Sequence, residues 1–180
     1  MRVANFIPLF LLVFGCAQTL TPPPCTEEVN PAEIAAVPAD QLQIDLDIID
    51  DTLAARSIVP IIDPTGIRYT IERQGGGREV QCLQKPILVT YTGKLLSPDA
   101  RALKFGGIFD QGTISISLST VIVGWQVMFL QFKAGTKATI YLPSGFAYGT
   151  LSRPAPLGSG RADIPANANL IFEIELLDVQ

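Results

Sequence analysis

Four stretches of the chain alternate apolar and polar residues with a period of two, which is the pattern of a strand with one buried face. Small polar residues or glutamates, such as Ser115, Thr139 and Glu173, separate the apolar positions. These apolar positions are Ile87, Val89 and Tyr91; Ile114, Ile116 and Leu118; Ala138, Ile140 and Leu142; and Leu170, Phe172, Ile174 and Leu176. The pattern predicts an antiparallel sheet with one side turned to the core.

Between the second and third stretches the period becomes helical. Trp125, Met128, Phe129 and Phe132 follow one another at positions i, i+3, i+4 and i+7, which predicts one short helix that Gly135 ends. The simplest assembly is an α+β domain over residues 64–180, in which an antiparallel β-sheet wraps around this one short α-helix.

A second helical pattern precedes the domain, in a segment of N-terminal helix and linker over residues 38–63. Its apolar residues are Leu42, Leu46, Ile49 and Leu53, and Asp40 is placed to cap it. We expect this stripe to pack on its own domain, because it is too short for a good dimer seam. The acidic residues of the helix are expected largely to face water; they are Asp45, Asp47, Asp50 and Asp51.

The first residues are typical of an exported protein. Residues 1–15 form a signal peptide, with Arg2 before an apolar run that is too short to span a bilayer. The run ends in Val13-Phe14-Gly15-Cys16, which resembles a bacterial lipobox and predicts a lipid on Cys16; an ordinary secretory signal cut nearby is the alternative. Ala17 favours the outer membrane, facing the periplasm, as the site in the cell envelope. Residues 16–37 are then expected to be a lipidated flexible tether.

Composition excludes several classes of function. The chain of 180 residues has a net charge of −4 and no basic patch, which argues against nucleic-acid binding. It contains no histidine, so histidine triads, histidine general bases and histidine metal sites are excluded. No cofactor is implied.

Two cysteines remain once Cys16 is assigned to lipid. Cys25 and Cys82 form an even pair in a compartment that permits disulfides, and a bridge would contribute about 4 kcal/mol of stability. Cys25 lies in the proline-rich run Thr21-Pro22-Pro23-Pro24-Cys25, which is typical of an extended tether. We therefore favour free thiols and keep the bridge as the alternative.

Chemistry without acid and base groups remains open to a shaped apolar pocket. Rotation about an X-Pro bond is such a reaction, because its barrier of roughly 18–20 kcal/mol comes from the lost amide resonance. An ordered series of motifs over residues 85–180 resembles the FKBP family of peptidyl-prolyl cis/trans isomerases. The motifs are Val89-Thr90-Tyr91-Thr92-Gly93, Phe109-Asp110, Val121-Ile122-Val123-Gly124-Trp125, Lys133-Ala134-Gly135-Thr136-Lys137, Phe146-Ala147-Tyr148-Gly149, Ile164-Pro165 and Leu170-Ile171-Phe172-Glu173-Ile174-Glu175-Leu176.

The resemblance assigns an aromatic pocket to four of these residues. Trp125 corresponds to the indole at the pocket floor, on which the proline ring rests. Tyr91, Phe109 and Phe172 correspond to the aromatic walls. From the residues alone, plain core would be the favoured interpretation of both Trp125 and Phe172.

The remaining assignments are polar or lie at the rim. Val121 and Ile122 correspond to the segment before the helix, where the Ile122 N–H would donate to the ligand carbonyl. Tyr148 corresponds to a hydroxyl that donates to the substrate backbone. Asp110 corresponds to a carboxylate in the wall, although the residues alone equally suggest a turn aspartate, and Ile164 to an apolar contact on a loop.

The chain departs from the family pattern at the partner of this aspartate. In the family an arginine in the following segment often steadies it, but residues 111–120 contain no basic residue. Arg153 or Arg161 would have to substitute. The connections 95–108 and 150–163 are also longer than usual.

Three hypotheses of function follow. The resemblance implies an isomerase that acts on proline-containing segments of exported proteins, is tethered to a membrane through Cys16, and accepts macrolide-type FKBP ligands. The missing arginine and the long loops favour a non-catalytic module that binds proline segments. A structural surface lipoprotein is the third, and in each case we expect a monomer.

Overall fold

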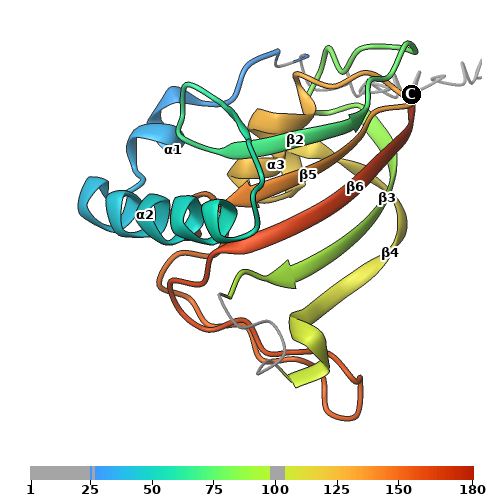
Figure 1. Cartoon of the computed structure of the whole chain (residues 1–180). Coiled ribbons are helices and arrows are strands. Elements are labelled where there is room, and N and C mark those ends of the chain that lie inside the picture. Colours follow the sequence, from blue (N-terminus) through green and yellow to red (C-terminus); the bar gives the residue numbers. More distant parts are fainter. Residues whose placement is uncertain (1–24, 26, 98–103) are drawn as a thin grey trace, which may run out of the picture.

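The computed structural model describes residues 25, 27–97 and 104–180, so the predicted signal peptide and the predicted lipid site at Cys16 lie outside the described residues. A six-stranded antiparallel sheet has the order β1-β2-β5-β6-β3-β4 (Figure 1). Its strands are β1 (Ile61–Ile62), β2 (Arg68–Arg73), β3 (Pro86–Leu95), β4 (Ile108–Ser117), β5 (Lys137–Leu142) and β6 (Leu170–Val179). The helices are α1 (Pro31–Ala35), α2 (Ala39–Ala55) and α3 (Val123–Phe129), with 3-10 turns η2 (Lys104–Gly107), η3 (Leu118–Thr120) and η4 (Ser144–Phe146). The predicted α+β architecture is confirmed.

Helix α3 packs on one face of the sheet and forms the main core with it. Met128 and Phe129 of α3 are fully buried, as are Ile140 and Leu142 of β5. Gly124 permits this approach, because a Cβ atom there would lie 2.2 Å from a methyl group of Leu142. The alternating strands thus turn their apolar positions toward α3, as the period-two pattern predicts.

Helix α3 is shorter than its apolar stripe predicts. It ends at Phe129, and the N–H groups of Gln131 and Phe132 bond to carbonyl groups three residues earlier. This tighter turn still buries Phe132, whose ring lies 6.0 Å from that of Tyr69 on β2. Gly135 therefore shapes the later turn to β5 rather than ending the helix.

Helix α2 covers the opposite face of the sheet. Ile49 and Leu53 pack with Tyr141 and Ile171, which alternate along β5 and β6 with the residues that face α3. The stripe of α2 therefore packs on its own domain, as expected. The helix begins after Pro38, whose side chain cannot cap it, and Asp40 lies within the first turn rather than at the cap position.

The acidic residues of α2 do not all face water. Asp45 is only 1% exposed, and the carboxylate of Asp50 lies 2.7 Å from the guanidinium of Arg68 on β2. The expectation was wrong for Asp45 because Ser144, which donates to one of its oxygens, lies 99 residues further along the chain.

The expected flexible tether is corrected over residues 29–37. Asn30 accepts a hydrogen bond of 3.0 Å from the N–H of Ala32 and so caps α1. Val29 is buried, and Ile34 and Val37 pack against the main core. This apolar contact outweighs the proline-rich composition, and residues 29–37 belong to the folded unit.

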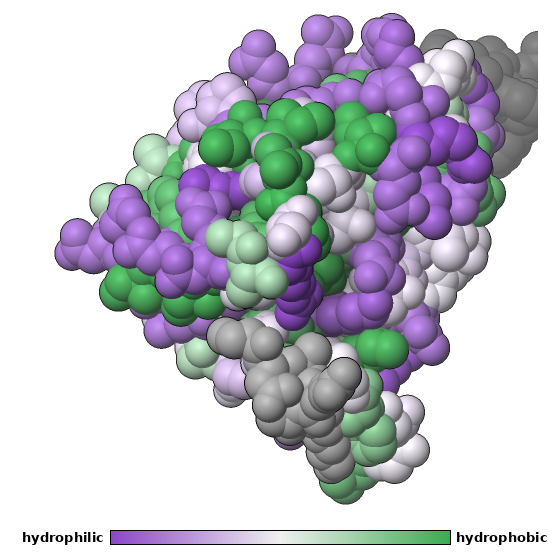
Figure 2. Space-filling view, viewed as in Figure 1, coloured by the Kyte–Doolittle hydropathy of each residue, from purple (hydrophilic) through white to green (hydrophobic). Residues whose placement is uncertain are grey.

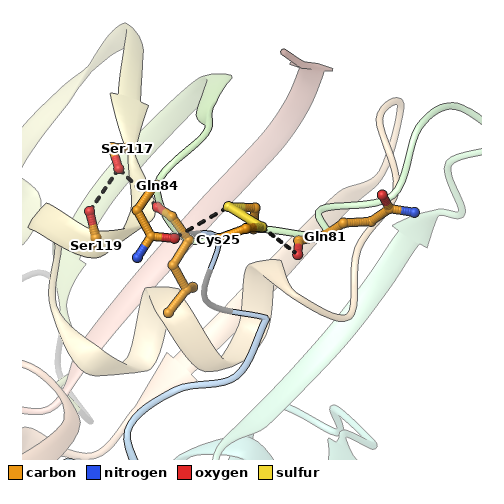
Figure 3. The surroundings of a disulfide bond; sticks show 7 residues. Cys25, Gln81, Gln84, Ser117 and Ser119 are labelled. Atoms are coloured by element: carbon orange, nitrogen blue, oxygen red, sulfur yellow. Dashed lines mark hydrogen bonds between the residues drawn. A yellow bond between two sulfur atoms is a disulfide. The ribbon is translucent and has the colours of Figure 1, made fainter. Parts of the chain in front are cut away.

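Cys25 and Cys82 are joined in a disulfide with a Cα–Cα distance of 5.3 Å (Figure 3). The preference for free thiols was therefore wrong. The segment that precedes α1 runs back over the loop before β3, where the Cys25 sulfur lies 3.6 Å from the carbonyl oxygen of Gln81. The bridge ties the N-terminal segment to the sheet domain.

An exposed apolar segment lies at the β1 edge. Val59, Ile61 and Ile62 are exposed, and Figure 2 shows hydrophobic surface gathered over the segment between α2 and β2. None of the described helices has the length and hydrophobicity needed to cross a membrane.

Candidate functional site

A cavity of about 260 Å³ opens between α3 and the β3-β4 end of the sheet. Its lining residues come from strands β3, β4 and β6, from helix α3, from the segment 120–122 that leads into α3, and from the turn that follows η4. They are Tyr91, Phe109, Asp110, Ile114, Ile116, Thr120, Val121, Ile122, Trp125, Tyr148 and Phe172. The structure thus brings together eight of the nine residues singled out in the sequence.

Trp125 lies at the centre of an aromatic cluster. Its ring centroid is 5.3 Å from that of Tyr91 and 5.2 Å from that of Phe172, both in edge-to-face geometry. Trp125 is 4% exposed, and its indole nitrogen has no hydrogen-bond partner among the described residues. Rings that interlock in this way hold the floor of the cavity rigid.

The rings of Phe109 and Phe172 form one wall, 5.6 Å apart and nearly perpendicular. Gly93 on β3 lies behind both of them, opposite Asp110 on β4 and Phe172 on β6. A Cβ atom at Gly93 would stand 2.5 Å from the Phe109 ring and 3.0 Å from the Phe172 ring. The wall therefore requires glycine at this position.

Asp110 connects the cavity to the long loop 150–163. One of its carboxylate oxygens accepts a hydrogen bond of 2.6 Å from the hydroxyl of Tyr91, and the other lies 2.9 Å from the guanidinium of Arg161. Arg161 therefore supplies the cation that residues 111–120 lack. Burial raises the pKa of Tyr91, and the hydrogen bond to Asp110 adds to the shift, so the phenol stays protonated at neutral pH.

Two groups at the cavity can donate hydrogen bonds to a ligand. The N–H of Ile122, just before α3, and the hydroxyl of Tyr148 have no acceptor among the residues described. Burial raises the pKa of Tyr148, although the nearby Arg153 opposes this shift. The Arg153 guanidinium lies 5.2 Å from the centre of the Tyr148 ring.

Ile164 does not line this cavity. It lies in an adjoining cavity of about 140 Å³ that shares Phe109, Asp110 and Tyr148 with the first. Its N–H and C=O groups pair with those of Arg153 at 2.9 and 2.8 Å. This pairing closes the base of the long loop and holds Ile164 beside the cavity rather than within it.

Sequence reasoning missed three lining residues. Ile114 and Ile116 were predicted on the buried face of a strand, but β4 is an edge strand and both are only half-buried at the mouth of the cavity. The alternation of these two isoleucines with polar residues is the sequence signal that could have identified them. Thr120 lies in η3, where no pattern distinguished it.

The site offers an apolar, ring-lined space with two hydrogen-bond donors and one carboxylate. That carboxylate is already bonded to Tyr91 and Arg161, so it is poorly placed to exchange protons. Within the described part of the chain, no group of three or more potential ligands could hold a metal ion. A larger cavity of about 440 Å³ near Arg78 and Val179 contains none of the predicted residues.

Comparisons with known proteins point to one family. A sequence model described as FKBP-type peptidyl-prolyl cis-trans isomerase matches residues 82–177. The "FKBP-type peptidyl-prolyl cis-trans isomerase FkpA" of Buchnera aphidicola subsp. Schizaphis graminum is 34% identical over 118 residues, which are 64% of this chain and 42% of that protein. The "FK506-binding protein 1" of Gibberella zeae is 33% identical over 117 residues, which are 62% of this chain and 96% of that protein.

Solved structures agree in fold. The peptidyl-prolyl cis-trans isomerase of Pseudomonas syringae pv. tomato superimposes with a TM-score of 0.56 at 26% identity, covering 78% of this chain and 94% of that one. FkpA from Escherichia coli gives a TM-score of 0.55 at 26% identity, covering 79% and 63% respectively. The chain spans about two fifths of the length of the FkpA relatives that it matches.

Proposed function

Because the chain belongs to the FKBP-type peptidyl-prolyl cis-trans isomerase family, we propose that it accelerates rotation about X-Pro bonds in polypeptides. One observation carries the proposal: the predicted floor, walls and donor groups surround a single apolar cavity of about 260 Å³. Eight residues that lie up to 81 positions apart, from Tyr91 to Phe172, converge on it.

The proposed mechanism is differential binding of the twisted amide. A planar X-Pro amide is more dipolar than the twisted one, so an apolar cavity favours the twisted form. The proline ring would rest on Trp125, while the Ile122 N–H and the Tyr148 hydroxyl bond to carbonyl groups of the substrate. No proton transfer is needed, which agrees with the absence of histidine from the chain.

A non-catalytic module that binds proline segments is less well supported. That hypothesis depended on the missing arginine partner of Asp110 and on the long loops, and Arg161 makes the missing ion pair at 2.9 Å. The ion pair leaves Asp110 and Tyr91 in an ordered wall. We expect the length of the loop 150–163 to affect which substrates the cavity prefers.

Exchange spectroscopy on the peptide Ala-Leu-Pro-Phe tests the activity directly. The folded domain should accelerate cis/trans exchange, and Trp125→Ala should abolish most of the acceleration by removing the floor. Tyr148→Phe should lose one hydrogen bond, about 1 kcal/mol and so about fivefold in rate. No acceleration by the folded parent would leave the binding module, and acceleration that survives Trp125→Ala would place the active groove elsewhere.

We further propose that a lipid on Cys16 tethers the domain to the bacterial envelope, in the outer membrane facing the periplasm. The support is the short apolar run that ends at Gly15-Cys16. The substrates would then be exported proteins. Cys16→Ser should abolish uptake of labelled fatty acid and release the protein from membranes. A variant that stays as membrane-bound as the parent contradicts the lipid.

The same cavity is proposed to take macrolide-type FKBP ligands, because they would occupy the floor and walls that the proline ring uses. Such a ligand should inhibit the isomerisation competitively, and Trp125→Ala should weaken its binding. We propose a monomer as the working form, which sedimentation equilibrium tests. A stable dimer would contradict that expectation.

A further inference from the structure

Helix α2 carries a buried carboxylate that the isomerase mechanism does not use. Asp45 is 1% exposed, and no Lys or Arg among the described residues pairs with it. Hydrogen-bond donors contact both of its oxygens instead. Gln41 donates to one oxygen at 2.9 Å, and Ser144 donates to the other from its N–H at 2.8 Å and from its hydroxyl at 2.6 Å.

Further contacts fix the same position. The Asn169 side chain accepts a bond of 3.1 Å from the Ser144 N–H and donates one of 3.4 Å to the backbone carbonyl of Asp45. Val37 packs on Gly145, since a Cβ atom there would stand 2.6 Å from its methyl group. The segment 37–45 thus holds the start of η4 to the rest of the domain.

Ser144 in turn fixes the backbone on both sides of Tyr148. Its carbonyl oxygen accepts hydrogen bonds from the N–H groups of Ala147 and Gly149, each at 2.9 Å. Tyr148 lies between these two residues and reaches the cavity with its ring. A displacement of Ser144 would therefore be transmitted to the Tyr148 hydroxyl by the short turn 144–149.

We propose that Asp45 is a positioning residue for Tyr148: through Ser144 it holds the turn that presents the Tyr148 hydroxyl to the substrate. The expected effect on kcat/KM rests on the proposed isomerase function. The ordering of the turn 144–149 by Asp45 does not depend on that function. The N-terminal helix thereby becomes part of the active unit, although Asp45 lies 99 residues before Ser144.

A double-mutant cycle separates positioning from general stability. Asp45→Ala should lower kcat/KM about fivefold in the parent, the effect of losing the Tyr148 hydrogen bond. In the Tyr148→Phe background it should have almost no further effect, because the two changes remove the same interaction. Equal losses in both backgrounds would overturn the proposal.

Two variants control for folding. Asp50→Ala removes the ion pair of the same helix with Arg68, neither of which bonds to η4, and should leave kcat/KM unchanged. Asp45→Asn keeps an oxygen that can accept from Ser144 and should restore most of the rate. If Asp45→Ala fails to fold, Ser144→Ala removes only the hydroxyl bond and should give a smaller loss that again vanishes with Tyr148→Phe.

Amide hydrogen exchange tests the positioning without any turnover. In Asp45→Ala the N–H groups of Ala147 and Gly149 should exchange about tenfold faster, whereas the amides of β3 and α3 should not change. Asp50→Ala should leave all of these amides as in the parent. Unchanged protection of the turn in Asp45→Ala overturns the proposal even in an inactive domain. Faster exchange in a domain that does not isomerise would refute only the enzymatic function.

Discussion

Gly93→Ala is the sharpest test of the cavity wall, because it adds one methyl group behind the rings of Phe109 and Phe172. The new Cβ atom would lie 2.5 Å from Cζ of Phe109 and 3.0 Å from Cε1 of Phe172. Carbon atoms that do not repel one another stand about 3.5–4.0 Å apart. The Phe109 ring must therefore move by roughly 1 Å, away from β3 and toward the cavity.

The magnitude follows from this displacement. Overpacking of this kind typically costs about 1–3 kcal/mol of stability, which for one domain of this size lowers the melting temperature by roughly 2–12 °C. The effect on the reaction should be larger, because a misplacement of about 1 Å in a binding site can cost about 100-fold in rate. We expect kcat/KM to fall by about 10- to 100-fold in a domain that remains folded.

Gly112→Ala provides a matched control. Gly112 lies on β4 opposite Tyr91, and a Cβ atom there would meet nothing within 4 Å. The control should keep the parent rate and a melting temperature equal to or above that of the parent. Peptide exchange spectroscopy and thermal unfolding measure both quantities. If folded Gly93→Ala isomerises as fast as the parent, Phe109 and Phe172 do not form the wall that the substrate meets.

Three further predictions concern pH, redox state and the ion pair at the rim. The isomerisation rate should be flat from about pH 6 to 9, because the chain has no histidine to titrate there. It should fall only above about pH 10, since burial raises the pKa of both Tyr91 and Tyr148. The stability that these protonated phenols contribute is present below about pH 10 and is lost as the pH rises through their raised pKa. A rate that changes with pH near neutrality in the peptide assay would contradict this. Reduction of the Cys25–Cys82 disulfide should lower the free energy of unfolding by up to about 4 kcal/mol in urea titrations; no change on reduction would show that the bridge constrains nothing. Arg161→Ala should cost less than about 1 kcal/mol in thermal unfolding, because its side chain is 43% exposed and that of its partner 36%; a larger loss would mean that the pair supports the whole loop.

The sheet and the aromatic cavity could be predicted because their signals are local. Alternation along β3, β5 and β6 follows from the two-residue repeat of a strand, and the helical spacing after Trp125 identifies α3. The aromatic residues of the site belong to motifs that follow one another in a fixed order along the chain. Both the hydrophobic period and the order of the motifs can be read from the sequence without knowing the fold.

Contacts between distant segments could not be predicted in the same way. Asp45 sits among acidic residues on a helix, where a carboxylate ordinarily faces water, and its partner Ser144 is 99 residues away. The cationic partner of Asp110 could be narrowed only to Arg153 or Arg161, because the path of the loop 150–163 decides which guanidinium reaches the carboxylate. Cys25 followed three prolines, and nothing local indicated that the chain turns back to Cys82.

The place of β6 in the sheet determines when a newly made chain can fold. Residues 170–179 lie between β5 and β3, so without them the described strands separate into β1-β2-β5 and β3-β4, two groups that share no backbone pairing. Synthesis is vectorial, and of the described strands the one that joins the two groups is made last. Pairings across such long stretches of chain close slowly. Until β6 is made, the edges of β5 and β3 that it will pair with stay open, so this chain would itself need protection from aggregation while it is being synthesised.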